Sequence, residues 1–386
     1  MRKVYMDNAA TTSLAPEVLE QMMPYLTATY GNPSSVHAFG REAKTGLDKA
    51  RQQVAAALNA ELDEIIFTGC GTESDNTVLL GVAGKYKAKG NHIITTNIEH
   101  HAILHTAEYL EKHGCEVTYL PVDEFGRVSP EQVAAAIKEN TILVSIMFAN
   151  NEVGTIMPIA EIGAVCKEKG VLFHTDAVQA VGHVPIDVKA MNIDMLSLSA
   201  HKFHGPKGVG ALYVRRGIRL PSFIMGGGQE KGRRAGTENT AGIVGLGAAA
   251  ELSCVHMAEN AERMTALRNR LMEGIEREIP YVKLNGHRTQ RLPNNVNYSI
   301  RYIEGESILL MLDMNGIAAS SGSACTSGSL DPSHVLLALG LDHETAHGSV
   351  RLTLGDETTE EDIDYVIAVL KKTAERLREM SPLYKG

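Results

Sequence analysis

Residues 196–208 read LSLSAHKFHGPKG, a run in which leucine and serine alternate before a lysine and a glycine–proline turn. The alternation predicts a strand over Met195–Ser199, and the turn residues predict that the chain leaves the sheet directly afterwards. The strand would therefore present Ser199, His201 and Lys202 at its carboxyl end, the edge at which open α/β sheets bind ligands. Taken alone, a lysine before a turn is more often a solvated surface residue, and that alternative stays open at this point.

Short apolar runs and longer helical patterns alternate around this stretch. The expected strands are Glu64–Thr68, His92–Thr96, Glu116–Leu120, Leu143–Phe148, Val171–Thr175, Met195–Ser199 and Val209–Val214. The expected helices between them are Thr72–Ala88, His101–His113, Pro130–Glu139 and Ile159–Lys169. Such alternation predicts an α/β fold with a mostly parallel seven-stranded sheet covered on both faces.

The alternation of expected strands and helices ends near Gly236. A long helical pattern follows from about Asn239 to Ile279, with room for a bend. After it we expect a strand at Asn295–Ile300, a helix at Glu306–Asn315, a Ser/Gly-rich loop at 320–329, a strand at Val350–Leu354 and a helix at Thr359–Met380. This pattern predicts a large domain over residues 16–255 and a smaller α+β domain formed by residues 1–15 and 256–386.

Length, charge and cysteine content narrow the class of protein. The 386 residues exceed what one compact core usually holds, which also favours two domains. A formal net charge of −9 argues against nucleic acid as the main partner, and the short basic cluster at 231–234 does not change this. We expect no membrane span, no signal peptide and a cytoplasmic location. Five cysteines without a CxxC pair argue against a disulfide framework and a structural zinc site.

Two further segments complete a candidate cofactor site around Lys202. The apolar run Val171–Thr175 ends in Asp176, whose carboxylate is suited to pair with a protonated pyridine nitrogen, although an N-cap role is also open. Residues 67–72 read FTGCGT, a strand, a glycine-rich turn and a helix start, where backbone N–H groups bind anions. Since a lysine amine bonds aldehydes, the three segments together outline a site for pyridoxal 5'-phosphate (PLP). The glycine turn alone is weak support, because many such loops contain glycine.

Motifs spread over nearly the whole chain make it resemble a known family. They are MDNAATT (6–12), GNPSSVH (31–37), TESDN (72–76), EH (99–100), NNEVG (150–154), HTDAVQ (174–179), SAHK (199–202), RAGTEN (234–239) and SSGSACTS (320–327). The sequence is similar to the cysteine desulfurases of the NifS/IscS type, which are fold-type I PLP-dependent transferases. The resemblance implies PLP as cofactor, L-cysteine as substrate, L-alanine as product and a homodimer.

The resemblance also implies a role for individual residues. Lys202 would hold PLP as a Schiff base and move protons at the substrate α-carbon, while His100 would stack on the ring and act as an acid/base. Arg351 and Asn151 would bind the substrate carboxylate, a task that suits the planar fork of arginine. Without the motifs, His100 and Arg351 could equally be surface residues. The remaining cofactor contacts would be Asp176 to the pyridinium, Gln179 to the phenolic oxygen, Gly71, Thr72, Ser199 and His201 to the phosphate, and Thr237 to the phosphate of the other subunit.

Cys325 lies in the segment SSGSACTSGSL, residues 320–330. The segment has few apolar side chains that could fix it by burial, and its glycines permit wide backbone motion. The other four cysteines lie in helical patterns, at a strand start or in the phosphate turn. We therefore expect Cys325 to attack the substrate sulfur as a thiolate and to carry the resulting persulfide to an acceptor. The resemblance names an iron–sulfur scaffold as one acceptor. It implies no resident metal site, only a transient contact of Cys325 with a nascent cluster.

Two alternatives remain beside this interpretation. One is a selenocysteine lyase or cysteine lyase on the same fold, against which the Cys325 segment argues. The other is a sulfur-delivery or scaffold protein without its own catalysis, against which the intact set of Lys202, Asp176, His100 and Arg351 argues. The sequence ends at Gly386 without the longer tail of many housekeeping members, which resembles the NifS branch. The choice between nitrogenase and general cluster assembly stays open.

Overall fold

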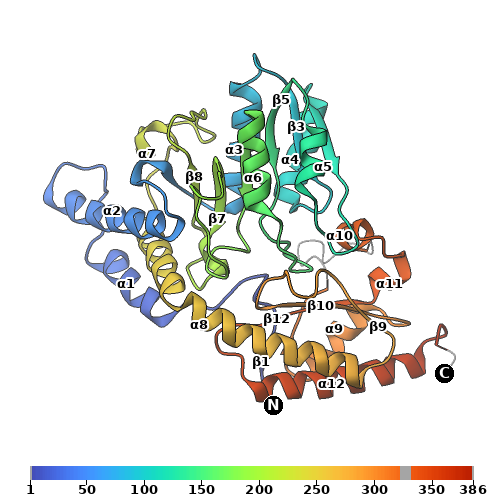
Figure 1. Cartoon of the computed structure of the whole chain (residues 1–386). Coiled ribbons are helices and arrows are strands. Elements are labelled where there is room, and N and C mark those ends of the chain that lie inside the picture. Colours follow the sequence, from blue (N-terminus) through green and yellow to red (C-terminus); the bar gives the residue numbers. More distant parts are fainter. Residues whose placement is uncertain (1, 322–331, 385–386) are drawn as a thin grey trace.

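The computed structural model describes residues 2–321 and 332–384. A seven-stranded sheet in the order β2-β8-β7-β6-β5-β3-β4 forms its centre (Figure 1). Strand β8 runs antiparallel to β2 and β7, and the pairs formed by β3, β4, β5, β6 and β7 are parallel, which confirms the predicted sheet. The strands are β2 (Ile65–Thr68), β3 (His92–Thr96), β4 (Glu116–Leu120), β5 (Thr141–Ser145), β6 (Leu172–Asp176), β7 (Met195–Ser199) and β8 (Gly210–Val214).

Helices cover both faces of this sheet. Successive strand residues point to opposite faces, so Ile66 and Ile93 pack with helices α3 and α4, whereas Phe67 and Ile94 pack with α5, α6 and α2. Both sides are apolar, as expected for a mostly parallel sheet. The helices are α2 (Ala38–Leu58), α3 (Gly71–Lys85), α4 (His101–Lys112), α5 (Pro130–Ala136) and α6 (Ile159–Lys169).

Helix α8 (Thr240–Glu278) links the sheet to the rest of the molecule (Figure 1). It is one continuous helix of 39 residues, close to the predicted range. By length and composition α8 could span a bilayer, a case that the search for apolar runs did not foresee, but 56% of the relevant window is buried inside the structure. Its first half packs against α2 and α1 (Pro16–Thr27), as a core helix does.

The remaining elements form a smaller α+β part. A three-stranded antiparallel sheet has the order β12-β10-β9, and the short strand β1 pairs with β11 in parallel. The N-terminus lies beside α12 (Figure 1), where Arg2 pairs with Asp362. The elements are β1 (Val4–Tyr5), β9 (Val282–Leu284), β10 (Asn295–Ile300), α9 (Gly305–Met314), β11 (Ile317–Ala318), α10 (His334–Ala338), α11 (His343–His347), β12 (Ser349–Thr353) and α12 (Glu360–Met380). The short helix α7 (Gln229–Gly232) packs on the sheet instead, where Glu230 pairs with Arg51 of α2.

The smaller part has its own hydrophobic core. Val4 and Met6 pack there with the second half of α8, with β10 and β12, and with α12. The sheet faces described above belong to two other clusters. The domain boundaries near residues 15 and 255 stay a prediction.

Candidate active site

A cavity of about 330 Å³ lies where β2, β3, β5, β6 and β7 end at one edge of the sheet. Ten residues predicted from the sequence line it: Gly71, Thr72, His100, Asn151, Asp176, Gln179, Ser199, His201, Lys202 and Arg351. Thr237 does not. It is exposed and lines a separate hollow of about 140 Å³. Cys325 lies outside the described residues.

Lys202 follows β7 through one turn of 3-10 helix, Ala200–Lys202. Its Nζ donates hydrogen bonds to the main-chain oxygens of Ala9 at 2.6 Å and Ala10 at 2.9 Å. Both acceptors belong to residues 7–12, which we call the N-terminal strap. The strap thus holds the lysine amine inside the cavity.

The N-terminal strap makes further contacts along the same side of the cavity. Gln179 Nε2 donates to the Ala9 oxygen at 3.0 Å, and Thr12 N–H donates to the His201 oxygen at 2.9 Å. His201 Nδ1 lies 3.1 Å from Thr11 Oγ1. Burial, with the nearby Lys202 charge, lowers the His201 pKa to about 4, so this ring is neutral at pH 7.

Asp176 is the last residue of β6 and is 7% exposed. Its Oδ1 accepts a hydrogen bond from Val178 N–H at 2.9 Å, while burial raises its pKa to about 6 against the lowering effects of that bond and of Lys202. Asp75, from α3, lines the cavity as well. Burial and the Asp176 charge raise the Asp75 pKa well above its usual range. Burial and the Asp176 charge thus favour the neutral form of Asp75, whereas Asp176, with a pKa of about 6, carries charge at pH 7.

The first turn of α3 supplies the anion-binding end of the cavity. Gly71 and Thr72 open the helix after Cys70, and the first N–H groups of a helix have no partner within it. A Cβ on Gly71 would lie 2.6 Å from Val178 Cγ2, so glycine is required for the helix to start this close to the end of β6. Glu73 accepts from Gly69 N–H at 2.8 Å and pairs with Arg234 at 2.9 Å, which fixes the turn.

His100 caps the N-terminus of α4. Its Nδ1 accepts a hydrogen bond from Ala102 N–H at 3.1 Å, so the proton of the neutral ring lies on Nε2. Burial and the neighbouring Lys202 lower the His100 pKa to about 4. His100 is thus a neutral ring with one N–H at the cavity wall.

Arg351, on β12, closes the opposite end of the cavity and is 2% exposed. Its Nη2 donates to Asp7 Oδ1 at 2.9 Å and its Nη1 to the Asn151 oxygen at 3.0 Å. The buried Nε–H has no hydrogen-bond partner within residues 2–321 and 332–384. An unpaired buried donor is costly, and a bound carboxylate would satisfy it.

The family model for class-V aminotransferases matches residues 4–366. A cysteine desulfurase IscS of Clostridium botulinum is 62% identical over all 386 residues and 97% of its own length, and one of Methanosarcina thermophila is 57% identical over 99% of this chain and 94% of its own length. The chain belongs to the NifS/IscS-type cysteine desulfurases of the class-V aminotransferase family. A solved NifS-like protein agrees in fold, with a TM-score of 0.91 and 41% identity over 97% of this chain and 99% of that one.

Members of the class-V aminotransferase family use PLP, and the cavity of this desulfurase fits that group. It offers an amine at Lys202, a charged carboxylate at Asp176 and an anion-binding helix start at Gly71. In the part of the chain that the structure describes, the buried Asp75 Oδ1 and Arg351 Nε have no hydrogen-bond partner. Both atoms can therefore bond to a ligand in the cavity.

Several residues of this desulfurase's cavity were missed by the sequence reasoning. Asp7, Asp75 and Glu152 lie within motifs that carried the resemblance, yet no role was given to them. His101 and His334 also line the cavity. The signal for His101 was its position next to His100, a pair that was interpreted only as a surface feature. His334 lies outside the motifs, so nothing in the sequence was a reason to select it.

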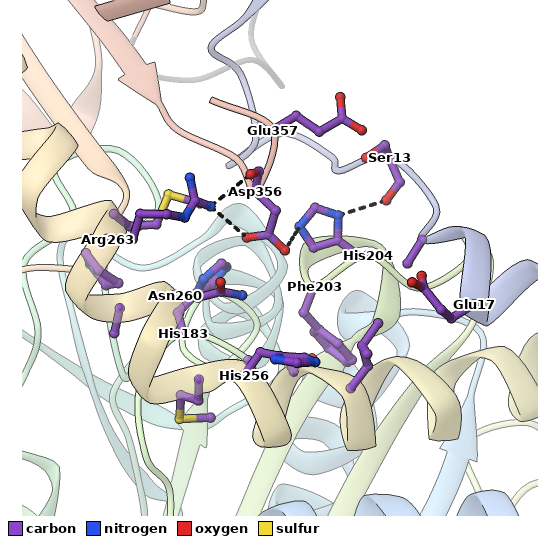
Figure 2. A pocket seen from close by; sticks show the side chains of 18 of the residues that line it. Ser13, Glu17, His183, Phe203, His204, His256, Asn260, Arg263, Asp356 and Glu357 are labelled. Atoms are coloured by element: carbon purple, nitrogen blue, oxygen red, sulfur yellow. Dashed lines mark hydrogen bonds and ion pairs between the residues drawn. The ribbon is translucent and has the colours of Figure 1, made fainter. Parts of the chain in front are cut away.

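A second hollow of about 420 Å³ lies between residues of α8, the segment before α1 and the turn that holds Phe203 and His204 (Figure 2). There His204 bridges the Ser13 oxygen and Asp356, and Arg263 donates to the Asp356 oxygen (Figure 2). The hollow shares none of the predicted catalytic side chains. It contacts the site through His183, whose Nε2 donates to the Lys202 oxygen at 3.2 Å.

Proposed function

We propose that this chain converts L-cysteine to L-alanine and leaves the sulfur as a persulfide on Cys325. The observation that carries the proposal is that one cavity holds the Lys202 amine, the buried Asp176 carboxylate and Arg351 with an unpaired N–H. A related solved structure, SspA in complex with cysteine, is 39% identical over 91% of this chain and 99% of that one, with a TM-score of 0.81. Its ligand supports cysteine as the substrate.

The residues are suited to hold PLP in one orientation. Asp176 would face the ring nitrogen, Gln179 the phenolic oxygen, and Gly71, Thr72, Ser199 and His201 the phosphate. When bound, PLP withdraws electrons from the α-carbon of an amino acid and so weakens the bonds around it. A carboxylate at Asp176 favours the protonated ring nitrogen on which this withdrawal depends.

Lys202 and His100 are placed to accept and donate protons. Lys202 Nζ would bond the cofactor aldehyde and, once released by the substrate amine, take up the α-proton. The strap oxygens of Ala9 and Ala10 hold this amine in place. His100 would lie against the ring, and its Nε2–H can be donated to a developing negative charge.

Arg351 and Asn151 would orient the substrate. The carboxylate of L-cysteine would accept from the unpaired Nε–H of Arg351, whose other nitrogens are already fixed by Asp7 and Asn151. A guanidinium held on two sides loses little freedom on binding. This contact would direct the substrate side chain away from β12.

Cys325 would accept the sulfur. Its thiolate attacks the substrate sulfur, the S–S bond forms, and the bond between sulfur and the β-carbon breaks with its electron pair on carbon. A proton then completes the methyl group of alanine. The persulfide would pass to an acceptor such as an iron–sulfur scaffold, and no nucleic acid or membrane partner is proposed.

The assembly and the location are part of the proposal. We propose a cytoplasmic homodimer in which Thr237 reaches the cofactor phosphate of the other subunit. The exposure of Thr237 outside its own cavity supports this arrangement. We also propose the division into residues 16–255 and 1–15 with 256–386, which the separate core around Val4 and Met6 supports.

The variant Cys325→Ser tests the function most directly. It should keep the visible absorption of bound PLP but release no sulfide and no alanine in steady state from L-cysteine, because an alcohol does not accept the sulfur. The assay measures alanine, sulfide and the absorption spectrum of the same sample. Full turnover by Cys325→Ser would refute the assignment of Cys325, and a colourless wild-type protein would refute the PLP enzyme.

A further inference from the structure

Two consecutive residues tie the start of helix α10 to the wall of the active-site cavity. Ser333 Oγ donates a hydrogen bond to Glu152 Oε2, and His334 Nε2 donates one to the main-chain oxygen of Glu99 at 3.1 Å. Glu152 and His334 line the cavity. The two acceptors follow β5 and β3, so α10 bridges the loops that also carry Asn151 and His100.

The Ser333 hydroxyl uses its whole hydrogen-bonding capacity. As the N-cap of α10, its Oγ accepts from Val335 N–H at 3.1 Å and from Leu336 N–H at 3.4 Å. A hydroxyl has two lone pairs and one proton, so capping leaves the proton for Glu152. The bond to Glu152 therefore does not compete with the cap: Glu152→Ala removes the bond and leaves the cap, whereas Ser333→Ala removes both.

Glu152 is held so that its carboxyl group meets Ser333. Its N–H donates to Asn150 Oδ1 at 2.9 Å, and its main-chain oxygen accepts from Asn297 Nδ2 at 3.1 Å. The residue is 1% exposed. Burial raises the Glu152 pKa, while the Ser333 hydroxyl and the Arg351 charge act in the opposite direction. The main chain of Glu152 is thus fixed on both sides, and its buried carboxyl group contacts Ser333.

Ser320, just before residues 322–331 in the sequence, bonds to Arg351 at the same end of the cavity. Ser320 and Arg351 form an antiparallel bridge, with Arg351 N–H donating to the Ser320 oxygen at 2.6 Å and Ser320 N–H to the Arg351 oxygen at 3.2 Å. Arg351 is the residue proposed to bind the substrate carboxylate. In sequence, Cys325 lies between these two attachments.

We propose that Glu152 and Ser333 are positioning residues for sulfur transfer, because their hydrogen bond holds α10 at the substrate end of the cavity. The proposal rests on the proposed function, since it takes Cys325 as the acceptor of sulfur. Neither residue exchanges protons or electrons with the substrate. Their loss should therefore lower kcat and leave KM nearly unchanged, because Arg351 and Lys202 keep their contacts.

The test compares the PLP-loaded wild type with Glu152→Ala, Glu152→Gln, Ser333→Ala and the double variant Glu152→Ala/Ser333→Ala. Ser129→Ala is the matched control, because Ser129 caps the exposed helix α5 far from the cavity. Alanine formation from L-cysteine gives kcat and KM, the visible absorption reports cofactor loading, and thermal unfolding reports stability.

We expect Glu152→Ala and Ser333→Ala each to lower kcat about tenfold or more at unchanged absorption, and the double variant to be no slower than the slower single variant. Glu152→Gln should keep most activity, since its amide oxygen still accepts from Ser333. Ser129→Ala should change stability alone. Wild-type kcat in Glu152→Ala, multiplying effects in the double variant, or a Gln variant as slow as Ala would each overturn the proposal. If the wild type forms no alanine, the proposed function itself is refuted, and the positioning role with it.

Discussion

Arg351 Nη2 donates to Asp7 Oδ1 at 2.9 Å and joins two residues that lie 344 positions apart in the sequence. The Arg351 side chain is 2% exposed, and that of Asp7 is 20% exposed. The pair fixes the guanidinium from the side of the N-terminal strap and leaves its Nε–H for a ligand. A buried arginine whose Nε–H has no hydrogen-bond partner among the described residues is therefore a geometric basis for recognising a carboxylate.

Arg351→Lys should lower kcat/KM for L-cysteine about tenfold to a hundredfold. Lysine keeps the positive charge but lacks the fork that contacts Asp7, Asn151 and the substrate together. The loss should appear mainly in KM, measured from initial rates of alanine formation. An unchanged KM would place the carboxylate elsewhere. The exposed Arg277, which pairs only with its neighbour Glu278, provides the matched control as Arg277→Lys.

Lys202→Ala should remove the visible absorption band that covalently held PLP gives, because alanine has no amine to bond the cofactor aldehyde. The measurement is an absorption spectrum after gel filtration of the PLP-treated protein. Lys207→Ala, five residues further along the chain and exposed, should keep the band. Wild-type absorption in Lys202→Ala would refute the assignment.

Replacement by asparagine should affect PLP binding differently at the two buried carboxyl groups of the cavity, Asp176 and Asp75. Asp176→Asn should weaken PLP binding about tenfold or more, because it removes the charge that faces the ring nitrogen. Asp75→Asn should bind PLP nearly as the wild type does, since burial and the Asp176 charge raise the Asp75 pKa and so favour its neutral form. Titration of each apoprotein with PLP, followed by absorption, checks both. Equal losses would contradict the assignment of charge to Asp176 alone.

Ionisation of Glu99 should lower the free energy of unfolding as the pH rises from 6.5 to 8. Burial raises the Glu99 pKa from 4.5 to about 8, so the folded state holds a proton that the unfolded state has lost. In this range the free energy of unfolding should decrease with pH by up to about 1.4 kcal/mol per unit for this group. Asp75, also raised, acts in the same direction.

Glu99→Gln should reduce that slope, because an amide does not ionise and its oxygen can still accept from Thr96 and from Met147 N–H. Urea unfolding of the PLP-saturated protein at several pH values gives the slope. The exposed Glu124 serves as control in Glu124→Gln. Near pH 6.5 the buried His174, with a pKa lowered to about 3, acts in the opposite direction, because the unfolded state still binds a proton that the folded state does not. Comparison of Glu99→Gln with the wild type cancels this contribution. An identical slope in Glu99→Gln would contradict the buried, protonated carboxyl.

The large sheet was predictable because strands such as His92–Thr96 and Met195–Ser199 are short runs bounded by turn residues and alternate with helical patterns; the structure buries both of their faces. Strand pairs of two or three residues, such as β1 with β11, have too few residues to show a period. Helices α1 and α2 were not assigned, although Pro16 at the start of α1 and Asn59 after α2, with φ 55°, are regular end signals.

The cavity was predictable where each side chain lies directly after a strand, as Asp176 and Lys202 do. Contacts such as Ser333 with Glu152 were not, because they join loops 181 residues apart and depend on how the smaller part of the molecule packs on the sheet. The N-terminal strap was visible as the motif MDNAATT, but only the folded chain shows its oxygens next to Lys202.

The pairing of Asp7 with Arg351 has a consequence for biosynthesis. Strand β12 is synthesised more than 300 residues after the N-terminal strap, and until then the Asp7 side chain lacks Arg351 and the cavity has no wall opposite Asp176. A nascent chain therefore cannot complete its active site before β12 has been made, however early the seven-stranded sheet forms. A truncated translation product that lacks β12 would have no competent site.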